Sequence, residues 1–188
     1  SDLHDLKNKL IGIYGIEDDN ELIRTKIKEI IGELEDSKKN LYTDNCILNS
    51  VLNIKYSAAQ VADIKIESNI FVPKYMNIDY GDMGVLFGNL LDNAIEANQG
   101  VDRKKRWINV SVKYEEHILI INIKNSKIRG SRRKKKGYLN HGIGLNSVKQ
   151  IVEKFNGIVE VQDFGEMYEV SAILYGICDD KDLGKSVL

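Results

Sequence analysis

Three polar residues near the start of the chain have the types and the spacing of a reactive imidazole supported by a carboxylate and a carboxamide. His4, Asp5 and Asn8 stand in SDLHDLKNKL, at the start of a stretch with helical apolar periodicity. A neutral imidazole is a fair nucleophile, and a carboxylate bonded to its other nitrogen fixes the tautomer and stabilises the positive charge that develops. Asn8 would share a helix face with His4, because residues four apart are neighbours there. Taken alone, the pattern is more typical of an ordinary surface helix.

A second group of polar residues lies in GNLLDNAIEAN, within a helix predicted over 83–98. Asn89, Asn93 and Glu96 fall on one stripe of this helix, beside an apolar arc. Mg²⁺ takes oxygen ligands and prefers few from the protein, with phosphates and waters completing its octahedron. The amide oxygen of Asn93 is suited to be one of those ligands, and a pair of solvated helix asparagines is the alternative.

Two glycines in HGIGLNSV, Gly142 and Gly144, precede and open another predicted helix. The first amides of a helix have no partner within it, and glycine lets a phosphate approach them. Seven basic residues and no acidic one stand between Lys127 and Lys136, in an aperiodic stretch over 126–141. This loop could close over a polyphosphate, with lysines such as Lys136 as point charges. A solvated loop is the alternative, and no aromatic interleaving or basic helix supports nucleic-acid binding.

A fourth candidate is the residue that ends a predicted strand, IINIKNS. Asn125 stands where a side chain can reach between the sheet and the helices. A carboxamide offers both an acceptor and a donor, as recognition of a base edge requires. A turn-forming Asn-Ser pair is the alternative interpretation.

Composition limits the classes of protein to which these residues can belong. The chain has 188 residues, 43% of them hydrophobic, which suffices for a core, and its formal net charge of −1 gives no global field for nucleic acid or membrane. No run of about eighteen apolar residues is present to span a bilayer. Cys46 and Cys178 fit neither a metal spacing nor a disulfide framework, so a reducing compartment is expected. No signal peptide is recognised, and the lack of an initiator methionine suggests a piece of a longer protein.

The apolar periodicity predicts an α+β protein in two parts. Residues 1–40 are expected to form a helical hairpin, and residues 41–188 a mixed, largely antiparallel sheet covered by helices on one face. The second part should contain helices over 47–58, 83–98 and 143–155, and strands over 64–72, 107–114, 117–125, 158–164 and 167–175. Asp79 or Asp82 would cap the long helix, and Gly157 would end the last one.

Together these motifs resemble the GHKL ATP-binding fold, and within it the catalytic domain of sensor histidine kinases. The N-box has its counterpart in NLLDNAIEA and the second glycine box in HGIGLNSVKQIVEKFNG. The phosphoacceptor box of the peptide-pheromone-sensing, AgrC-like quorum-sensing subfamily of Gram-positive bacteria has its counterpart in HDLKN. The order of the three boxes matches over nearly the whole chain. The resemblance implies a GHKL (Bergerat) sandwich after a truncated dimerisation and histidine-phosphotransfer hairpin, with ATP and Mg²⁺ as cofactors.

The resemblance also implies a role for each matching residue. His4 would be phosphorylated, Asp5 would hold its tautomer and accept its proton, and Asn8 would orient water when the response regulator is dephosphorylated. Asn93 would bind the metal, and Asn89 would polarise the γ-phosphate side or help to hold the metal. The remaining cofactor-binding residues implied by the resemblance are Asn125, Lys136, His141, Gly142, Gly144 and Leu145.

The sequence departs from the family pattern in two respects. The first glycine box, an aspartate followed by spaced glycines, is missing, and Asn125 stands where the adenine-binding aspartate is expected. An amide oxygen still accepts a hydrogen bond from the adenine amino group, although without charge. The chain also begins only three residues before His4, so the four-helix dimer of the full-length protein is expected to be weak or absent in this piece.

For partners and location, the resemblance implies a response-regulator receiver domain, a homodimer through the helical hairpin of the full-length protein, and the cytoplasmic side of a membrane-anchored bacterial sensor. Nucleic acid is not expected as a partner. Two alternatives stay open: a phosphotransfer or scaffold protein with a degenerate ATP site, and a GHKL ATPase of the chaperone or mismatch-repair type. Those ATPases use a glutamate base at the position of Asn89, and an asparagine there favours transfer to a side chain over activation of water.

Overall fold

The computed structural model describes residues 40–130 and 143–177. The chain divides between Asn40 and Leu41 into two units, and the elements described belong to the second. The helical hairpin predicted at the start of the chain lies outside the described residues.

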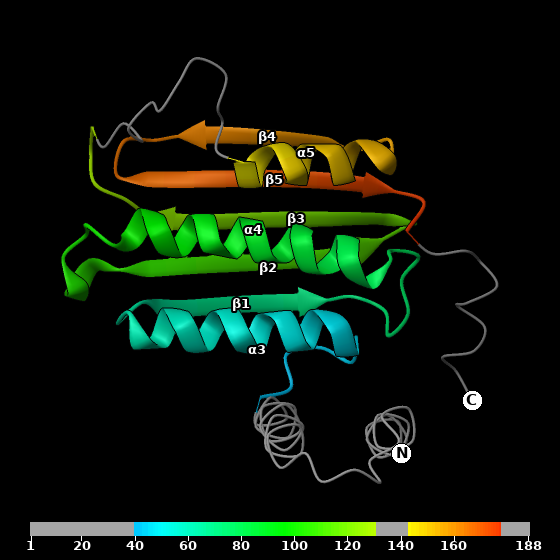
Figure 1. Cartoon of the computed structure of the whole chain (residues 1–188), viewed down its shortest axis with the longest axis horizontal. Helices are drawn as coiled ribbons and strands as arrows, with labels where there is room; N and C mark the ends of the chain where they lie inside the picture. The colour runs from blue at the N-terminus through cyan, green and yellow to red at the C-terminus, as the bar shows by residue number, and fades with distance from the viewer. Residues whose placement is uncertain (1–39, 131–142, 178–188) are drawn as a thin grey trace, which may run out of the picture. The chain divides into compact units, whose positions relative to one another are not determined.

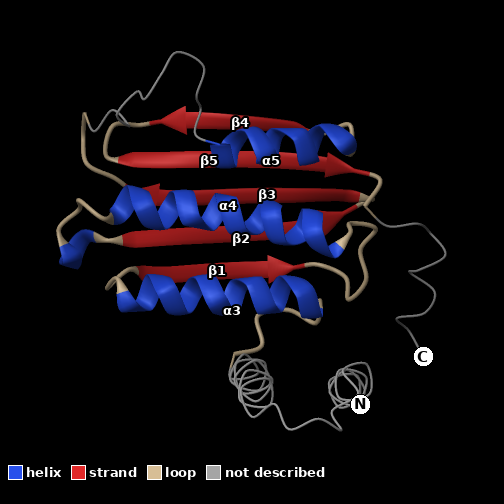
Figure 2. Cartoon of the chain, viewed as in Figure 1, coloured by secondary structure: helices blue, strands red, loops and turns tan. Residues whose placement is uncertain are grey.

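In the described part of the chain, five strands form one mixed sheet in the order β1-β2-β3-β5-β4 (Figure 1). The strands are β1 (Lys65–Phe71), β2 (Trp107–Glu115), β3 (Ile118–Ser126), β4 (Ile158–Asp163) and β5 (Met167–Tyr175). The helices are α3 (Cys46–Val61), α4 (Tyr80–Asn98) and α5 (Ile143–Lys154), with a 3-10 turn, η2 (Arg103–Lys105). β1 runs parallel to β2, and the other neighbours are antiparallel. All three α-helices lie on one face of the sheet (Figure 2), so the predicted α+β fold is confirmed.

Alternation along the strands decides which face of the sheet the helices cover. In β2 and β3 every second side chain is buried over most of the strand. The intervening positions carry polar side chains such as Lys113, Asn122 and Lys124, which therefore lie on the uncovered face. The helices close the core from the other side with their apolar faces, whose buried residues include Leu48, Leu52, Leu86, Leu90, Leu91, Val148 and Val152.

Side-chain caps fix where the first two helices begin. Asn45 Oδ1 accepts a hydrogen bond from the backbone N–H of Leu48 at 3.0 Å, at the start of α3. Asp79 Oδ1 accepts from the backbone N–H of Asp82 at 2.8 Å, so Asp79 is the cap of α4. The sequence left Asp79 and Asp82 as alternatives, and the helix begins three residues before the predicted residue 83 because the earlier aspartate caps it.

Two residues, Asn156 and Gly157, end α5, whereas the sequence predicts that Gly157 alone ends it. Asn156 takes the left-handed conformation with φ 50°, and the backbone N–H of Gly157 donates to the Val152 carbonyl oxygen at 2.9 Å. A Cβ atom at Gly157 would overlap the Ile173 carbonyl oxygen of β5. Gly157 is therefore needed for close approach to the sheet, while Asn156 makes the left-handed turn.

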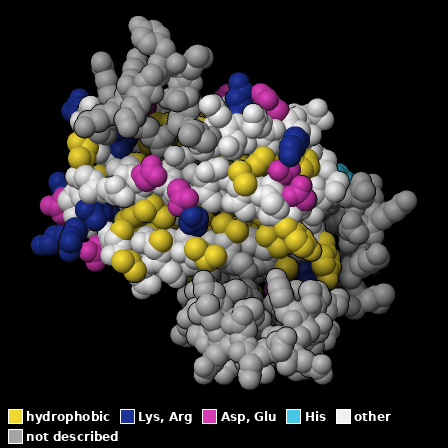
Figure 3. Space-filling view, in the orientation of Figure 1, with side chains coloured by type: hydrophobic (Ala, Val, Ile, Leu, Met, Phe, Trp, Pro, Cys, Tyr) yellow, Lys and Arg dark blue, Asp and Glu magenta, His cyan; other side chains and the backbone are white. Residues whose placement is uncertain are grey.

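Apolar side chains are exposed on the outer surface of the helix layer, as the yellow patches in Figure 3 show. They include Ile54 of α3, which is 65% exposed, and Val85 of α4, which is 43% exposed. Both line a groove between these two helices. In residues 40–130 and 143–177, none of the helices combines the length and the apolar character that a membrane span requires.

Candidate functional site

α4 carries the two asparagines that the sequence singles out. Its core-facing residues include Leu86, Leu90 and Ala94, which are buried against the rest of the core. Asn89 and Asn93 flank this buried face one turn apart, and both are half-buried. Their carboxamides therefore lie at the edge of the core, as the helical stripe predicts.

The first turn of α5 lies against Asn89. A Cβ atom at Gly144 would come within 3.0 Å of Asn89 Oδ1 and within 3.3 Å of its Cγ. Glycine thus leaves room for the carboxamide beside the start of the helix, where backbone N–H groups lack helical partners. The structure brings Asn89 and Gly144 together, although they are distant in sequence. The side chain of Leu145 is buried, so only its backbone remains to contact a ligand.

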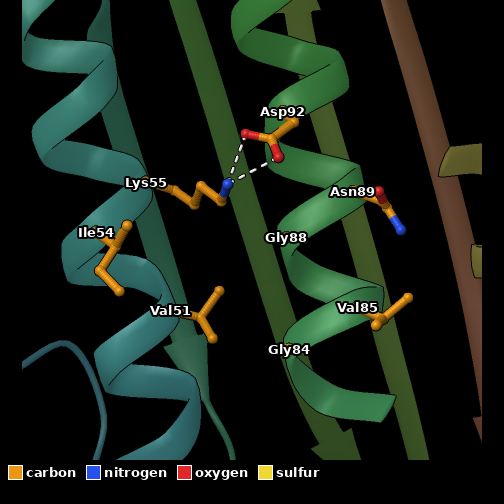
Figure 4. Close-up of a pocket in the computed structure, with 8 residues that line it drawn as sticks. All are labelled: Val51, Ile54, Lys55, Gly84, Val85, Gly88, Asn89 and Asp92. Carbon is orange, nitrogen blue, oxygen red and sulfur yellow. Dashed lines mark hydrogen bonds and ion pairs between the residues drawn. The ribbon is translucent and has the colours of Figure 1, made fainter. Parts of the chain in front are cut away.

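A different side of α4 faces α3 across a groove of about 340 Å³ (Figure 4). Lys55 Nζ of α3 lies 2.7 Å from each carboxylate oxygen of Asp92. Asn89 also lines this groove, but Figure 4 shows its side chain directed away from α3, whereas the Asp92 side chain is directed toward α3. Asp92, inside the motif NLLDNAIEA, therefore serves the packing of α3 on α4 rather than the side of α4 that faces α5.

Asn125 lies near the end of β3, on the face that the helices cover. It is paired with Ile108 of β2 and Tyr168 of β5, and its side chain is only 2% exposed. Its Nδ2 donates a hydrogen bond to the Ser126 carbonyl oxygen at 2.9 Å. Within residues 40–130 and 143–177 nothing donates to Asn125 Oδ1, so this oxygen is the acceptor left for a ligand.

A buried polar network behind Asn125 was missed by the sequence analysis. Asn98 ends α4 and is fully buried, and its Nδ2 donates to the carbonyl oxygens of Ala94 at 2.9 Å and Trp107 at 3.3 Å. Its Oδ1 accepts from the Trp107 backbone N–H at 3.2 Å and from the Ser126 hydroxyl. Asn98 thus joins the end of α4 to the first residue of β2 and the last of β3. The signal in the sequence is a further asparagine at the end of an apolar helical pattern.

Lys127, the first of the seven cations in the basic stretch, is held by the turn between β4 and β5. Its backbone N–H donates to the Glu166 carbonyl oxygen at 2.9 Å, and its ammonium pairs with the Asp163 carboxylate. The ammonium also lies 5.9 Å from the centre of the Tyr168 ring. The Lys127 ammonium, followed by the Gly165 backbone N–H, holds the pKa of the Asp163 carboxyl below its usual range. Lys127 is therefore engaged, and it is not among the cations available to a phosphate.

A divalent cation at this site would depend on carboxamides. Within the two described ranges, no three His, Cys, Asp or Glu residues gather into a metal site. Amide oxygens of Asn89 and Asn93, completed by oxygens of a ligand, are a donor set that suits Mg²⁺. Glycine at position 144 keeps the start of α5 close to the Asn89 carboxamide, because a Cβ there would lie 3.0 Å from Asn89 Oδ1. Six predicted site residues lie outside the described residues: His4, Asp5, Asn8, Lys136, His141 and Gly142.

Comparison with known proteins agrees with this architecture. The family model described as GHKL domain matches residues 78–174, more than half of the chain. A search of the curated proteins found no match.

Three solved structures share the fold at low sequence identity. The catalytic domain of the histidine kinase ThkA is 14% identical with a TM-score of 0.56, over 69% of this chain and 91% of that chain. The Acinetobacter baumannii histidine kinase AdeS is 14% identical with a TM-score of 0.55, over 93% and 95% of the two chains. The histidine kinase domain of the blue-light-activated kinase EL346 from Erythrobacter litoralis is 16% identical with a TM-score of 0.53, over 91% and 81%. The described unit has the fold of histidine kinase catalytic domains, and the chain belongs to the GHKL domain family.

Proposed function

We propose that this chain is the ATP-binding core of a protein-histidine kinase in a two-component system, which phosphorylates its own His4 and passes the phosphoryl group to an aspartate of a response regulator. The observation that carries the proposal is the contact between Asn89 and Gly144, which sets a carboxamide against the start of α5. Membership of the GHKL family supports nucleotide binding, and the fold of kinase catalytic domains supports phosphoryl transfer.

In this proposal the described residues bind and orient the nucleotide. Mg²⁺-ATP, when bound, supplies the phosphoryl group, and the metal neutralises part of its negative charge. Asn93 and Asn89 offer amide oxygens to the metal, and the backbone N–H groups at the start of α5 offer donors to the phosphates. Asn125 Oδ1 accepts a hydrogen bond from the adenine amino group. The other proposed contacts come from Lys136, His141, Gly142, Gly144 and Leu145.

Asn89 favours a kinase over an ATPase that activates water. A carboxamide does not take up a proton near neutral pH, so it cannot replace a glutamate as general base. Phosphoryl transfer then needs a nucleophile from another part of the protein. The histidine that matches His4 is this nucleophile in the resembled subfamily. Asp5 would hold the reacting tautomer and take the proton, and Asn8 would position water for dephosphorylation. The AgrC-like subfamily, the homodimer of the full-length protein and the membrane-anchored parent belong to the same proposal.

A scaffold or phosphotransfer protein with a degenerate ATP site is the second candidate. The missing first glycine box favours it, because one part of the usual nucleotide cradle is absent from the sequence. The close contact between Gly144 and Asn89 opposes this second candidate. A degenerate ATP site would not need to keep the Asn89 carboxamide against the start of α5, and a larger residue could then replace Gly144. Titration with Mg²⁺-ATP separates the two, since a degenerate site should bind no nucleotide at millimolar concentration.

Autophosphorylation with γ-labelled ATP tests the proposed transfer. His4→Asn is expected to abolish labelling and to leave ATP binding intact. His117→Asn is the matched control, because His117 lies at φ 66° in the turn between β2 and β3, and asparagine tolerates that conformation. The control should be labelled as the wild type is, and the label should be lost in acid. Labelling that survives His4→Asn would contradict the assignment.

A second experiment tests the metal ligand. Asn93→Ala is expected to remove the part of the ATP affinity that depends on Mg²⁺, measured by calorimetric titration with and without the cation. Asn69→Ala is the control, since Asn69 is exposed on β1, away from α4 and α5. Unchanged Mg²⁺ dependence in Asn93→Ala would mean that the metal is held elsewhere.

A further inference from the structure

The uncovered face of the sheet, opposite the helices, carries a group of apolar side chains at the end where β5 finishes. We call this group the apolar cluster, and it consists of Ile118 and Ile120 of β3, Ile158 of β4, and Ile173 and Tyr175 of β5. The register of the strands makes these residues neighbours. Ile118 is paired with Tyr175. Ile173 is paired with Ile120 on one side and with Ile158 on the other.

The apolar cluster is in contact with water. Ile158 is 56% exposed, Tyr175 is 41% exposed and Ile120 is 38% exposed. Further along the same face, β3 and β5 carry polar side chains such as Asn122 and Ser171, as expected for the solvent side of a sheet. A contiguous exposed apolar group on an otherwise polar face typically marks an interaction surface.

The residues on either side of the boundary between β3 and β5 complement one another. These two strands are neighbours in the sheet (Figure 1). Ile120 is paired with Ile173, so an aliphatic side chain stands at the same level on both strands. Lys124 is paired with Glu169, and its ammonium lies 3.4 Å from that carboxylate. A cation and an anion therefore stand at another shared level.

This pattern is self-complementary for two copies that pack face to face. A two-fold axis along the boundary sets β3 of each copy opposite β5 of the other, in an aligned packing of sheets. Ile120 then meets Ile173 of the other copy, and Lys124 meets Glu169 of the other copy. The two ion pairs alternate in sign, so like charges are not opposed at this level.

The size of the face also fits a weak dimer. The nine residues of β2, of β3 and of β5 extend over about 30 Å, and the width from β2 to β4 is about 19 Å. This face measures roughly 500–600 Å², and a specific interface buries at least about 500 Å² of each partner. The contact leaves the helix layer free, because the helices lie on the other side of the sheet (Figure 2).

We propose that the uncovered face of the sheet binds the same face of a second copy of this chain, with the apolar clusters packed together and Lys124 of each copy opposite Glu169 of the other. This interface is separate from the homodimer expected through residues 1–40. It does not depend on ATP binding, since Asn89 and Gly144 lie on helices on the opposite side of the sheet.

Sedimentation equilibrium of the whole chain tests this interface. The wild type is expected to form a reversible dimer with a micromolar to submillimolar dissociation constant, as suits an interface of this size. Ile120→Asp is expected to weaken association by about tenfold or more, because the symmetric contact buries the new carboxylate twice without a cation. Ile54→Asp is the matched control, since Ile54 is an isoleucine of the helix layer that is 65% exposed. The control should associate as the wild type does.

Charge reversal gives a second measurement of the same contact. Lys124→Glu alone opposes like charges across the interface and should weaken association by about tenfold. Lys124→Glu combined with Glu169→Lys restores the alternation of sign and should recover most of the affinity. Urea unfolding shows that each variant is folded, and the charge variants decide if Ile120→Asp does not fold.

Three results would overturn the inference. The first is a wild type that stays monomeric at about 0.2 mM, which would leave the apolar cluster to a different partner. The second is a folded Ile120→Asp that associates as the wild type does, because the dimer would then form through another part of the chain, such as residues 1–40. The third is an equal loss of affinity in Ile54→Asp, which would place the interface on the helix layer.

Discussion

At the scale of single residues, the contact with Asn89 requires glycine at position 144, although helix formation alone would favour alanine there. Glycine in a helix interior is less favourable than alanine by about 1 kcal/mol. The backbone of Gly144 does not take the left-handed conformation that favours glycine. The neighbouring side chain accounts for the glycine, because a methyl group at this position would lie 3.0 Å from Asn89 Oδ1.

Gly144→Ala is therefore expected to weaken ATP binding by about tenfold, or roughly 1.4 kcal/mol, because Asn89 must shift away from the helix start. The free energy of unfolding should stay within about 1 kcal/mol of the wild type, since the gain in helix propensity offsets the crowding. Gly84→Ala in α4 is the control, because no atom lies within 4 Å of its Cβ position. The control should leave binding unchanged and raise stability by up to about 1 kcal/mol. Calorimetry and urea unfolding measure both quantities, and wild-type affinity in Gly144→Ala would show that Asn89 is not needed at its present position.

At the scale of elements, Arg106 joins the carboxyl ends of two helices. Its guanidinium donates to the carbonyl oxygens of Ala62 at 2.7 Å, Gln99 at 3.1 Å and Val101 at 2.8 Å. Ala62 and Gln99 are the C-terminal caps of α3 and α4. A cation suits this place, because the last carbonyl groups of a helix lack internal partners and carry the negative end of its dipole.

Arg106→Gln is expected to lower the free energy of unfolding by about 2 kcal/mol, because a neutral and shorter side chain cannot reach three carbonyl oxygens at once. Arg103→Gln is a matched control within the same basic turn. Arg103 lies 3.3 Å from Asp63, and its side chain is 77% exposed, so that ion pair should contribute less than about 0.5 kcal/mol. Urea unfolding measures both variants, and equal losses would mean that Arg106 adds only surface charge.

The close approach of α5 to the sheet gives a second prediction at this scale. Gly157→Ala is expected to destabilise the unit by about 3 kcal/mol, because the new methyl group would overlap the Ile173 carbonyl oxygen, which belongs to backbone that cannot yield freely. Asn156→Gly should stay within about 1 kcal/mol of the wild type, since glycine adopts the same left-handed conformation. Thermal unfolding of the two variants compares them, and a stable Gly157→Ala would mean that α5 can move outward at little cost.

Local pattern predicts these elements well, because burial repeats along each strand and each helix. The alternation in WINVSVKY and HILIINIKN locates β2 and β3 to within one residue at each end. The same pattern does not predict the strand order, since pairing depends on residues far apart in the sequence. It also misses the partners of Asn98 and Lys127, because those partners lie on other elements and only folding brings them together. The resemblance to the GHKL fold assigns Asn89 and Gly144 to one nucleotide site, whereas the hydrogen bond from Asn125 to the Ser126 carbonyl oxygen is seen only in the structure.

At the scale of the whole described unit, stability depends on the layer between the helices and the sheet. Tyr56 of α3 lies in this layer and is 6% exposed. Its ring meets that of Tyr42 edge to face, with 4.8 Å between the ring centroids. Burial raises the pKa of Tyr56 to about 12, although its interaction with Ser68 of β1 lowers the pKa in part. The core layer thus holds a phenol that resists ionisation.

This pKa predicts that the unit loses stability in alkali. Below about pH 10 the Tyr56 phenol is protonated in both the folded and the unfolded chain, so it adds no pH dependence. Between about pH 10 and pH 12 the unfolded chain releases the proton while the folded chain keeps it, so the free energy of unfolding falls as the pH rises, by up to roughly 2–3 kcal/mol. Tyr56→Phe keeps the ring beside Tyr42 and has no proton to release, so its free energy of unfolding should fall less over the same interval. Urea unfolding of both proteins across this range measures the difference, and parallel curves would mean that the Tyr56 hydroxyl is reached by water in the folded state.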